Sequence, residues 1–412
     1  MRELTTWQEW FDADELIATA FLYPWDPDEA RQARQDEAEG KKPHLDQIWA
    51  TYAPDGRMES AIQTLPMKLA FDGAFVPATE LEMVGSRPEY RGSGNVRAMI
   101  TELFGIFRKR GDLFALLIPF SAAFYRKYGF EQVTRNVQHR IPIDQLQGFS
   151  CQLPVRQASR PEESVVLCRL YNDFALGHNL GIRRDEAEFA WRPGPEFGER
   201  DFLHQQSRRY TYIFGPEGAE RGYLTFRYEC KPDLPFVGSM CIDELVFDGP
   251  ETLRAMLGFV YGLRAKCRTV EVTTWGGLDL GLLLPEPSEA TRELEGHHMA
   301  RILNVVEVLR RMRYPQAAGE FSLAVHDDVM PQNAGCYRVS FADGRAVEVK
   351  RTEDETAGAA GEADLELDQR ALTQLVLGTC GLDEALWRPG VSLRGNRGTL
   401  AHVFRRKGIA AL

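Results

Sequence analysis

The amino-acid sequence predicts an α+β or α/β protein that is divided into about three domains. The first observation is length, because the chain has 412 residues and a domain typically contains about 100 to 200 residues. The second is composition: 44% of the residues are hydrophobic and 26% are charged, as in ordinary globular proteins. The third is that helical and strand-like hydrophobic patterns alternate along the chain.

In the first part of the chain, the residue pattern predicts a helix and a hairpin that are separated by a polar stretch. Residues 5–20 carry apolar side chains at roughly helical spacing and predict a helix. Residues 25–46 are polar and mixed in charge, which fits a solvated helix or a mobile flap. Residues 58–76 predict two strands around Phe71-Asp72-Gly73, because Asp-Gly is a strong hairpin signal.

Residues 79–130 are the segment that points to chemistry. A strand is expected at 80–86, followed by a turn with Gly92 and Gly94 and by a helix whose apolar positions recur from 96 to 107. Residues 113–119 are a continuous apolar run, typical of a buried parallel strand, and a short helix follows. A glycine turn that opens a helix can bind a phosphate with its backbone amides, and Arg91 adds a planar cation.

The rest of the chain predicts two further α+β units. In the middle unit we expect helices at 164–176 and 251–264 and strands at 210–214, 222–228, 240–247 and 269–274. Residues 284–288 contain two prolines and form a candidate linker. In the last unit we expect helices at 299–312 and 372–377, strands at 322–326, 336–341 and 346–350, and an acidic surface loop at 352–368.

Charge and cysteine content exclude several classes of partner and site. With 49 Lys and Arg against 60 Asp and Glu, the formal charge of −11 disfavours nucleic acid and favours a cationic small substrate. The seven cysteines include no C-x-x-C pair, and the adjacent His297 and His298 point apart on a helix, so no metal site is expected. The sequence contains no long apolar run and no signal peptide, so we expect no membrane span and a cytoplasmic location.

Two motifs resemble those of the GNAT acyl-CoA-dependent N-acetyltransferases: Pro88-x-x-Arg91-Gly92-x-Gly94 and Phe124-Tyr125-x-x-Tyr128-Gly129-Phe130. The chain more closely resembles the enhanced intracellular survival (Eis) branch, through Arg97-Ala98-Met99 and through residues 321–327 and 364–368. The general turn has a small residue where this chain has Val96, but branch members often carry a bulkier one. The resemblance implies a GNAT domain at 1–145, a degenerate GNAT-like domain at 146–290 and a sterol-carrier-protein-like domain at 291–412.

The resemblance also implies acetyl-CoA as co-substrate and a set of residues that bind it. Backbone groups of three strand residues would hold the pantetheine arm, the glycine turn would hold the pyrophosphate, and two residues on the next strand would flank the arm. In this order the implied binding residues are Val84, Gly85, Ser86, Arg91, Gly92, Ser93, Gly94, Asn95, Val96, Arg97, Phe120 and Ser121.

The implied chemistry needs a proton donor and a proton acceptor. An alkylamine has a pKa near ~10.4, so it must lose a proton before it attacks a thioester. By resemblance, Tyr125 is the acid that protonates the coenzyme A sulfur, and the terminal carboxylate of Leu412 is the base. A carboxylate is a weak base, so it would orient the ammonium group and pass the proton through water. Branch members commonly end in an aromatic residue, whereas this chain ends in Leu412, and His402 is an alternative acceptor.

We therefore expect an N-acetyltransferase that modifies a primary amine of a cationic small molecule, such as an aminoglycoside-like compound or a polyamine, or a lysine side chain. One alternative is an aminoacyltransferase, because paired GNAT-like domains also perform that reaction. Another is a non-catalytic lipid-binding or regulatory protein that uses the last domain. The resemblance further implies a homo-oligomer, a hexamer in the Eis branch.

Overall fold

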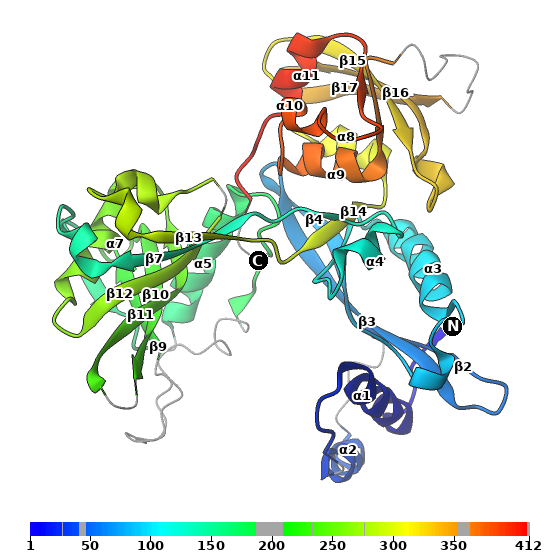
Figure 1. The fold of residues 1–412 in the computed structure, drawn as a ribbon, viewed down its shortest axis with the longest axis horizontal. Helices are drawn as coiled ribbons and strands as arrows, with labels where there is room; N and C mark the ends of the chain where they lie inside the picture. Colours follow the sequence, from blue (N-terminus) through cyan, green and yellow to red (C-terminus); the bar gives the residue numbers. More distant parts are fainter. Residues whose placement is uncertain are drawn as a thin grey trace.

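The computed structural model describes residues 1–26, 28–40, 47–160, 162–186, 209–231, 234–275, 277–352 and 363–409. These residues form three mixed sheets with flanking helices, which Figure 1 shows as three lobes. Two seven-stranded sheets belong to the first two lobes and a five-stranded sheet to the last. The predicted α+β class is confirmed. None of the described helices is long and apolar enough to cross a membrane.

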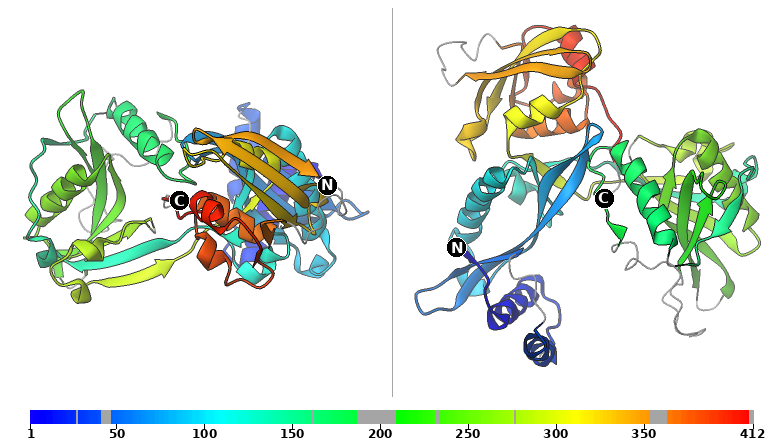
Figure 2. Two further views of the ribbon diagram at one scale, coloured as in Figure 1. Left: turned by 90° about the horizontal axis from the view of Figure 1, so that it is seen from above. Right: turned by 180° about the vertical axis from the view of Figure 1, so that it is seen from behind.

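The first sheet has the strand order β1-β2-β3-β4-β5-β14-β6. Its strands are β1 (Arg2–Glu3), β2 (Ile48–Tyr52), β3 (Met58–Phe71), β4 (Ala74–Ser86), β5 (Phe114–Leu117), β14 (Met299–Ile302) and β6 (Glu131–Gln132). Its helices are α1 (Trp7–Phe21), α2 (Asp28–Ala38), α3 (Asn95–Arg110) and α4 (Ala122–Arg126). Figure 2 shows α1 and α2 at the end of the long β3–β4 hairpin that is far from the third lobe.

Local signals predicted this part well. Helix α1 begins where Thr6 and Glu9 form a capping box, in which each side chain accepts a hydrogen bond from the other residue's backbone. Helix α2 lies within the polar stretch at 25–46, for which the sequence predicted either a solvated helix or a mobile flap. The β3–β4 turn is formed by Asp72 and Gly73, with φ angles of 48° and 84°, as a two-residue hairpin turn requires.

The segment predicted as one helix at 299–312 is instead a strand followed by a helix. Strand β14 pairs antiparallel with β5 and β6, so it completes the first sheet from far along the chain. All four of its residues are buried, including Arg301, which explains why its pattern did not alternate. Asn304 then caps α8 (Val305–Arg311), its side-chain oxygen accepting from the Glu307 amide at 3.2 Å.

The second sheet has the order β13-β7-β12-β11-β10-β9-β8. Its strands are β7 (Asn136–Pro142), β8 (Val155–Gln157), β9 (Arg209–Phe214), β10 (Gly222–Lys231), β11 (Leu234–Phe247), β12 (Cys267–Thr274) and β13 (Thr291–Glu295). Its helices are α5 (Glu163–Leu176) and α7 (Pro250–Gly262). Strands β7 and β13 lie outside the predicted range 146–290 but pair in this sheet, because pairing between distant segments decides membership. The predicted linker at 284–288 runs into a short 3-10 helix, Pro287–Glu289.

The third sheet has the order β17-β16-β15-β18-β19. Its strands are β15 (Gly319–His326), β16 (Gly335–Ala342), β17 (Arg345–Thr352), β18 (Leu365–Asp368) and β19 (Ser392–Leu393), and its helices are α8, α9 (Gln369–Leu377), α10 (Leu382–Ala385) and α11 (Arg397–Val403). Residues 353–362 of the predicted acidic loop lie outside the described residues. The end of that predicted loop is wrong, because Leu365 and Leu367 are buried in β18, which runs parallel to β15.

One hydrophobic core joins the first and third lobes. It contains Phe71 and Val76 of the first sheet, Leu323 and Leu375 of the third, and Ile409 near the end of the chain. A separate core lies on the opposite face of the first sheet, between β4, β5 and α3. The first sheet is therefore covered by the third lobe on one face and by α3 on the other.

Candidate active site

The two parallel strands β4 and β5 separate in the middle of the first sheet. They pair only at residues 78–80 and 114–116, and the pairing ends at Glu80 and Leu116. The β3–β4 ladder is irregular between Ala61 and Gln63, and Met83 on the bulged strand has a left-handed φ of 47°. A bulge bends its strand, so β4 turns away from β5 and leaves room for a ligand between them.

A cavity of ≈ 770 Å³ lies beside this opening, within the size range of small-molecule sites. Eleven of the twelve binding residues implied by the resemblance line it: Val84, Gly85, Ser86, Arg91, Gly92, Ser93, Gly94, Asn95, Val96, Arg97 and Phe120. The twelfth, Ser121, is not among the lining residues; it caps α4, accepting from the Phe124 amide at 3.3 Å. The cavity is also lined by Ala20, Phe21, Tyr90, Phe124 and Tyr128, which sequence reasoning did not place there.

The N-terminus of α3 faces this cavity and suits an anion. Gly92 and Gly94 have φ angles of 82° and 92°, and a Cβ on either would meet nothing within 4 Å. Gly94 is the N-cap and provides no side chain to satisfy the first backbone amides of the helix. The first turn has no acidic residue, and Arg91 and Arg97 line the same cavity. The Asn95 amide makes only a long hydrogen bond, of 3.5 Å, to Ser93 Oγ. The backbone amides, the helix dipole and two cations together favour a phosphate group at this position.

Apolar side chains cover the rest of the cavity. Phe21 at the end of α1 is 48% exposed and Phe120 after β5 is 70% exposed, although both are large hydrophobic residues. Phe21 was missed from the sequence because only the packing of α1 against β3 and β4 brings it here. An apolar wall beside a phosphate site fits a ligand that has both a diphosphate and a less polar arm.

Tyr125 lies on α4 directly behind the cavity wall. Its side chain is buried, with its ring centroid 5.5 Å from that of Phe120 and 5.1 Å from that of Phe124, two of the lining residues. Tyr125 itself is not among the lining residues. Burial, with a smaller contribution from Tyr128, raises its pKa to about 12. The phenol therefore keeps its proton at neutral pH and can donate a hydrogen bond to a developing thiolate.

A buried pair of ionisable residues, Glu80 and His298, lies where the strands separate. Glu80 Oε1 is 3.6 Å from His298 Nε2, and the two side chains are 10% and 8% exposed. Within the described residues, neither Glu80 Oε1 nor His298 Nδ1 has a hydrogen-bond partner. Burial and the nearby Glu82 raise the pKa of Glu80 to about 7, while burial lowers the pKa of His298 to about 4.

Glu80 and Tyr125 belong to opposite faces of the sheet. Side chains alternate along a strand, so Glu80 shares its face with Val76 and Ala78, which pack in the core of the third lobe. Tyr125 packs with Leu81 in the core on the α3 side. Sequence reasoning missed the Glu80–His298 pair because its two members are more than 200 residues apart and come together only when β14 enters the sheet.

Of the two predicted proton acceptors, His402 lies within the described residues and Leu412 lies outside them. His402 lies on α11, with its ring Nδ1 2.7 Å from the Gly398 carbonyl, and Figure 1 shows α11 on the far side of the third lobe from β4. It is therefore not brought to the cavity. The described chain ends at Ile409. This residue forms an isolated parallel β-bridge with Asn179 and packs in the core on the face of the first sheet that carries Glu80.

The corresponding turn of the second lobe does not have the features of an anion site. There, β11 leads into α7 through Asp248 and Gly249, with Glu251 in the first helical turn. Asp248 accepts a hydrogen bond from Thr252 and pairs with Arg221. Negative charge at a helix start disfavours a phosphate group there, in contrast to the start of α3. Among the described residues, no group of three or more His, Cys, Asp or Glu side chains is arranged to hold a metal ion.

Comparison with family models agrees with this architecture. Residues 2–133 match a model described as an acetyltransferase (GNAT) domain, and residues 180–302 match a second model with the same description. Residues 305–407 match a sterol carrier protein domain. No curated protein matches the chain. The predicted fold, two GNAT domains followed by a sterol-carrier-protein-like domain, is confirmed.

Three solved structures have the same fold over almost the whole chain. A probable N-acyltransferase from Enterococcus faecalis V583 is 20% identical, with a TM-score of 0.79 over 99% of this chain and 97% of that one. A GCN5-related N-acetyltransferase from Anabaena variabilis is 22% identical, with a TM-score of 0.78 over 98% and 97%. Eis1 from Mycobacterium abscessus is 18% identical, with a TM-score of 0.76 over 99% and 98%. These neighbours show that the fold is shared, and the two GNAT domain matches support an acyl-CoA-dependent N-acetyltransferase, as predicted.

Proposed function

We propose that this protein transfers the acetyl group of acetyl-CoA to a primary amine of a cationic small molecule, such as a polyamine or an aminoglycoside-like compound, or to a lysine side chain. The observation that carries the proposal is the cavity beside β4 and β5, which eleven of the twelve expected binding residues line. We also propose that the chain belongs to the Eis-like branch, because Arg97-Ala98-Met99 and residues 321–327 and 364–368 resemble that branch, and the shared fold of Eis1 agrees with this.

In this proposal acetyl-CoA binds along β4 with its reactive end at the opening between the strands. The diphosphate accepts hydrogen bonds from the amides at the start of α3 and pairs with Arg91 and Arg97. The pantetheine arm follows residues 84–86, where β4 pairs with no other described strand on the β5 side and its backbone groups are available. Its thioester then lies near Glu80 and Leu116, where the pairing of the two strands ends.

The chemistry follows from groups on the two faces of the sheet. A neutral amine attacks the thioester carbonyl and forms a tetrahedral intermediate, whose collapse breaks the C–S bond. Tyr125, held protonated by burial, donates a hydrogen bond to the departing sulfur from the α3 side. The proton of the attacking amine leaves on the opposite face. Two acceptors compete for it: the terminal carboxylate of Leu412, implied by the resemblance, and Glu80 next to His298.

A cationic acceptor agrees with the charges at the opening. Glu80 has no hydrogen-bond partner for Oε1 in the described residues, and Glu82 follows it on the same face of β4. Desolvation raises the pKa of both carboxyl groups. A bound ammonium group would offset this desolvation by stabilising their charged forms. The net charge of −11 favours the approach of the same class of molecule.

A binding assay and a turnover assay test the proposal separately. Acetyl-CoA should raise the melting temperature in a concentration-dependent manner, whereas an equal concentration of adenosine should raise it less, because adenosine lacks the diphosphate and the arm. Release of free thiol should then depend on an added amine, measured over a panel of polyamines, aminoglycosides and lysine peptides. A protein that acetyl-CoA does not stabilise, or that releases no thiol with any cationic amine, would contradict the proposal.

A further inference from the structure

The helix that carries Tyr125 depends on contacts from elsewhere in the protein. Helix α4 spans only Ala122–Arg126, and a helix of five residues has little stability of its own. After α4 the chain turns at residues 127–130 into β6, which has only two residues. The orientation of the Tyr125 ring therefore depends on the groups that hold the two sides of this segment, as well as on the aromatic rings that pack around it.

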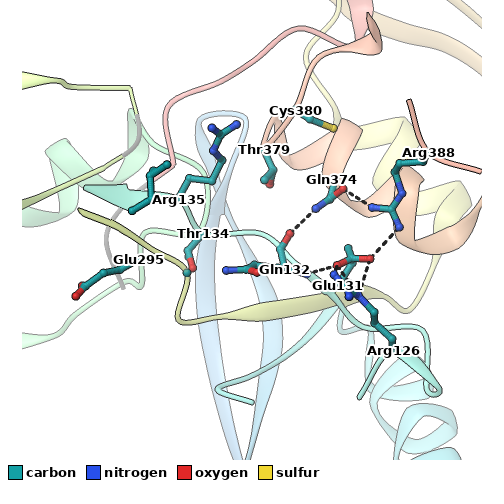
Figure 3. Close-up of a pocket in the computed structure, with 12 residues that line it drawn as sticks. Arg126, Glu131, Gln132, Thr134, Arg135, Glu295, Gln374, Thr379, Cys380 and Arg388 are labelled. Atoms are coloured by element: carbon teal, nitrogen blue, oxygen red, sulfur yellow. Dashed lines mark hydrogen bonds and ion pairs between the residues drawn. The ribbon is translucent and has the colours of Figure 1, made fainter. Parts of the chain in front are cut away.

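The first of these groups is a network of charged side chains that links Arg388 of the third lobe to Arg126 of α4 through Glu131 of β6 (Figure 3). Arg126 Nη2, next to Tyr125, lies 2.7 Å from Glu131 Oε1, and Arg388 Nη2 of the third lobe lies 2.8 Å from Glu131 Oε2. The Glu131 side chain is only 2% exposed. Burial opposes its ionisation, but the hydrogen bonds from Arg126 and Arg388 outweigh burial and keep its pKa below the ordinary value. Glu131 is therefore an ionised link between two arginines, one on each lobe.

The same network fixes the strand that follows α4. Arg388 Nη1 donates to Gln374 Oε1 at 2.6 Å, and Gln374 Nε2 donates to the Gln132 carbonyl at 2.7 Å, as Figure 3 shows. These residues line a cavity of ≈ 310 Å³, to which all three lobes contribute. Arg388 thus makes two directed hydrogen bonds, and both lead to β6, immediately after the α4 segment.

The second group holds the other end of the segment. Arg301 of β14 is fully buried and donates through Nη1 to the Tyr128 carbonyl at 2.5 Å. Its Nη2 pairs with both carboxylate oxygens of Asp327 in the third lobe, at 2.9 and 2.6 Å. Gly129 makes this approach possible, because a Cβ there would lie 1.9 Å from Arg301 Nη1. Two buried charges, one on each lobe, therefore fix the carbonyl that closes the turn after α4.

Asp327 is itself held rigidly. Its Oδ1 accepts hydrogen bonds from the backbone amides of Val329 and Met330, at 3.1 and 2.9 Å. In the same loop, Asn333 Oδ1 accepts from Arg108 near the end of α3, at 2.7 Å. The loop at 327–333 is thus a fixed support for both the Tyr125 segment and the helix whose N-terminus faces the cavity.

We propose that the third lobe acts as a positioning element of the transferase site, in which Arg388 through Glu131 and Asp327 through Arg301 fix α4 and so aim the Tyr125 hydroxyl at the sulfur. This inference rests on the proposed role of Tyr125. Arg388, Glu131, Arg301 and Asp327 are positioning residues, since they contact the Tyr125 segment and none of them lines the cavity. It also gives the sterol-carrier-protein-like fold a function that needs no lipid.

A double-mutant cycle in the full-length protein tests the proposal. Arg388→Gln should lower kcat at least about fivefold, because a small misplacement of a reacting group has a large effect on rate. KM for acetyl-CoA should change less than twofold, since Arg388 is not among the residues that line the cavity. In a Tyr125→Phe background Arg388→Gln should have no further effect on kcat, because residues that act through one another are not additive. Arg388→Lys, which keeps the charge but not both hydrogen bonds, should fall between wild type and Arg388→Gln.

The matched control is Arg394→Gln. Arg394 is also in the third lobe and pairs with Glu366 at 2.7 Å, so its loss removes a similar arginine–glutamate pair that belongs to the third lobe alone. It should leave kcat within twofold of wild type. Asp327→Asn serves as a second variant on the other contact and should show the same dependence on Tyr125.

Each outcome decides between the two proposals. Unchanged kcat in Arg388→Gln and Asp327→Asn, or an equal loss of kcat in the wild-type and Tyr125→Phe backgrounds, would overturn the positioning role while leaving the transferase proposal intact. An increase in KM alone would overturn it as well. Wild-type turnover in Tyr125→Phe measured by itself would instead remove the acid that the positioning role requires.

Discussion

Glu80 and His298 meet at the point where β4 and β5 separate, with Glu80 Oε1 3.6 Å from His298 Nε2 and both side chains almost completely buried. Burial raises the pKa of the carboxyl to about 7 and lowers the pKa of the imidazole to about 4. At neutral pH the imidazole is therefore neutral and the carboxyl is partly protonated. A carboxyl that titrates at the working pH is suited to accept a proton there.

The raised pKa of Glu80 predicts an effect on stability. A carboxyl whose pKa is higher in the folded state stabilises the protein at low pH, and this contribution is lost as the pH rises from the unfolded value to the folded one. The window therefore runs from the ordinary value of 4.5 to about 7, and the difference corresponds to about 3 kcal/mol. Glu80→Gln should gain stability relative to wild type between pH 5 and pH 8, measured by urea unfolding at both values. Equal differences at the two pH values would contradict the raised pKa.

Activity should depend on the same group if Glu80 accepts the proton. In the wild type, kcat/KM for the amine should rise as the pH increases through about 7, where Glu80 ionises. Glu80→Gln should remove the inflection near pH 7, leave only the rise that comes from deprotonation of the free amine, and lower kcat about 10²-fold. An inflection near pH 7 that persists in Glu80→Gln would assign the acceptor to another group.

Tyr125→Phe should lower kcat about 10²-fold, the effect typical of losing a general acid, while KM for acetyl-CoA changes little. The hydroxyl, whose pKa is about 12, should cause no loss of activity up to pH 10 in the wild type. Tyr128→Phe is the matched control, because Tyr128 lines the cavity and packs on the same Phe124 ring. Equal losses in the two variants would not support a specific role for Tyr125.

Two glycines at opposite ends of α3 allow the phosphate site to be tested. Gly94 at the N-terminus and Gly111 at the C-terminus have φ angles of 92° and 97°, and neither would place a Cβ within 4 Å of another group. Alanine at either position should cost a similar amount of stability, on the order of 1 kcal/mol, because of its backbone conformation. Only Gly94→Ala should also raise KM for acetyl-CoA, about five- to tenfold. A similar change of KM in Gly111→Ala would place the phosphate elsewhere.

Deleting residues 410–412 should separate the two proposed acceptors. If the Leu412 carboxylate receives the proton, the deletion should lower kcat about tenfold or more, without a large change in melting temperature, because Ile409 and the Lys407–Asp72 ion pair at 2.8 Å remain. His402→Ala should have no effect on kcat, since His402 lies on α11 and its ring is hydrogen-bonded to the Gly398 carbonyl. Full activity in the deletion variant would leave Glu80 as the acceptor.

Several parts of the fold and site were predicted from local sequence, each for a local reason. Asp72-Gly73 encodes a hairpin because its residues adopt left-handed φ angles readily, and the structure forms this turn. Gly92, Gly94 and the apolar spacing that follows predicted a turn and a helix, and α3 begins at Asn95. Residues 113–119 predicted a buried parallel strand, and β5 pairs parallel with β4.

Pairing between distant segments could not be predicted in this way. The sequence at 299–302 reads as the start of a helix, yet it forms β14, because the open edges of β5 and β6 supply hydrogen bonds that helical spacing cannot reveal. That single insertion brings His298 to Glu80 and Arg301 to the Tyr128 carbonyl. The sequence by itself determined the Asp72-Gly73 turn, the glycine turn before α3, the helix α3 and most of the residues around the cavity. Only the tertiary structure decided which ionisable groups lose water and face one another, since burial and distance, which set their pKa values, depend on the complete sheet.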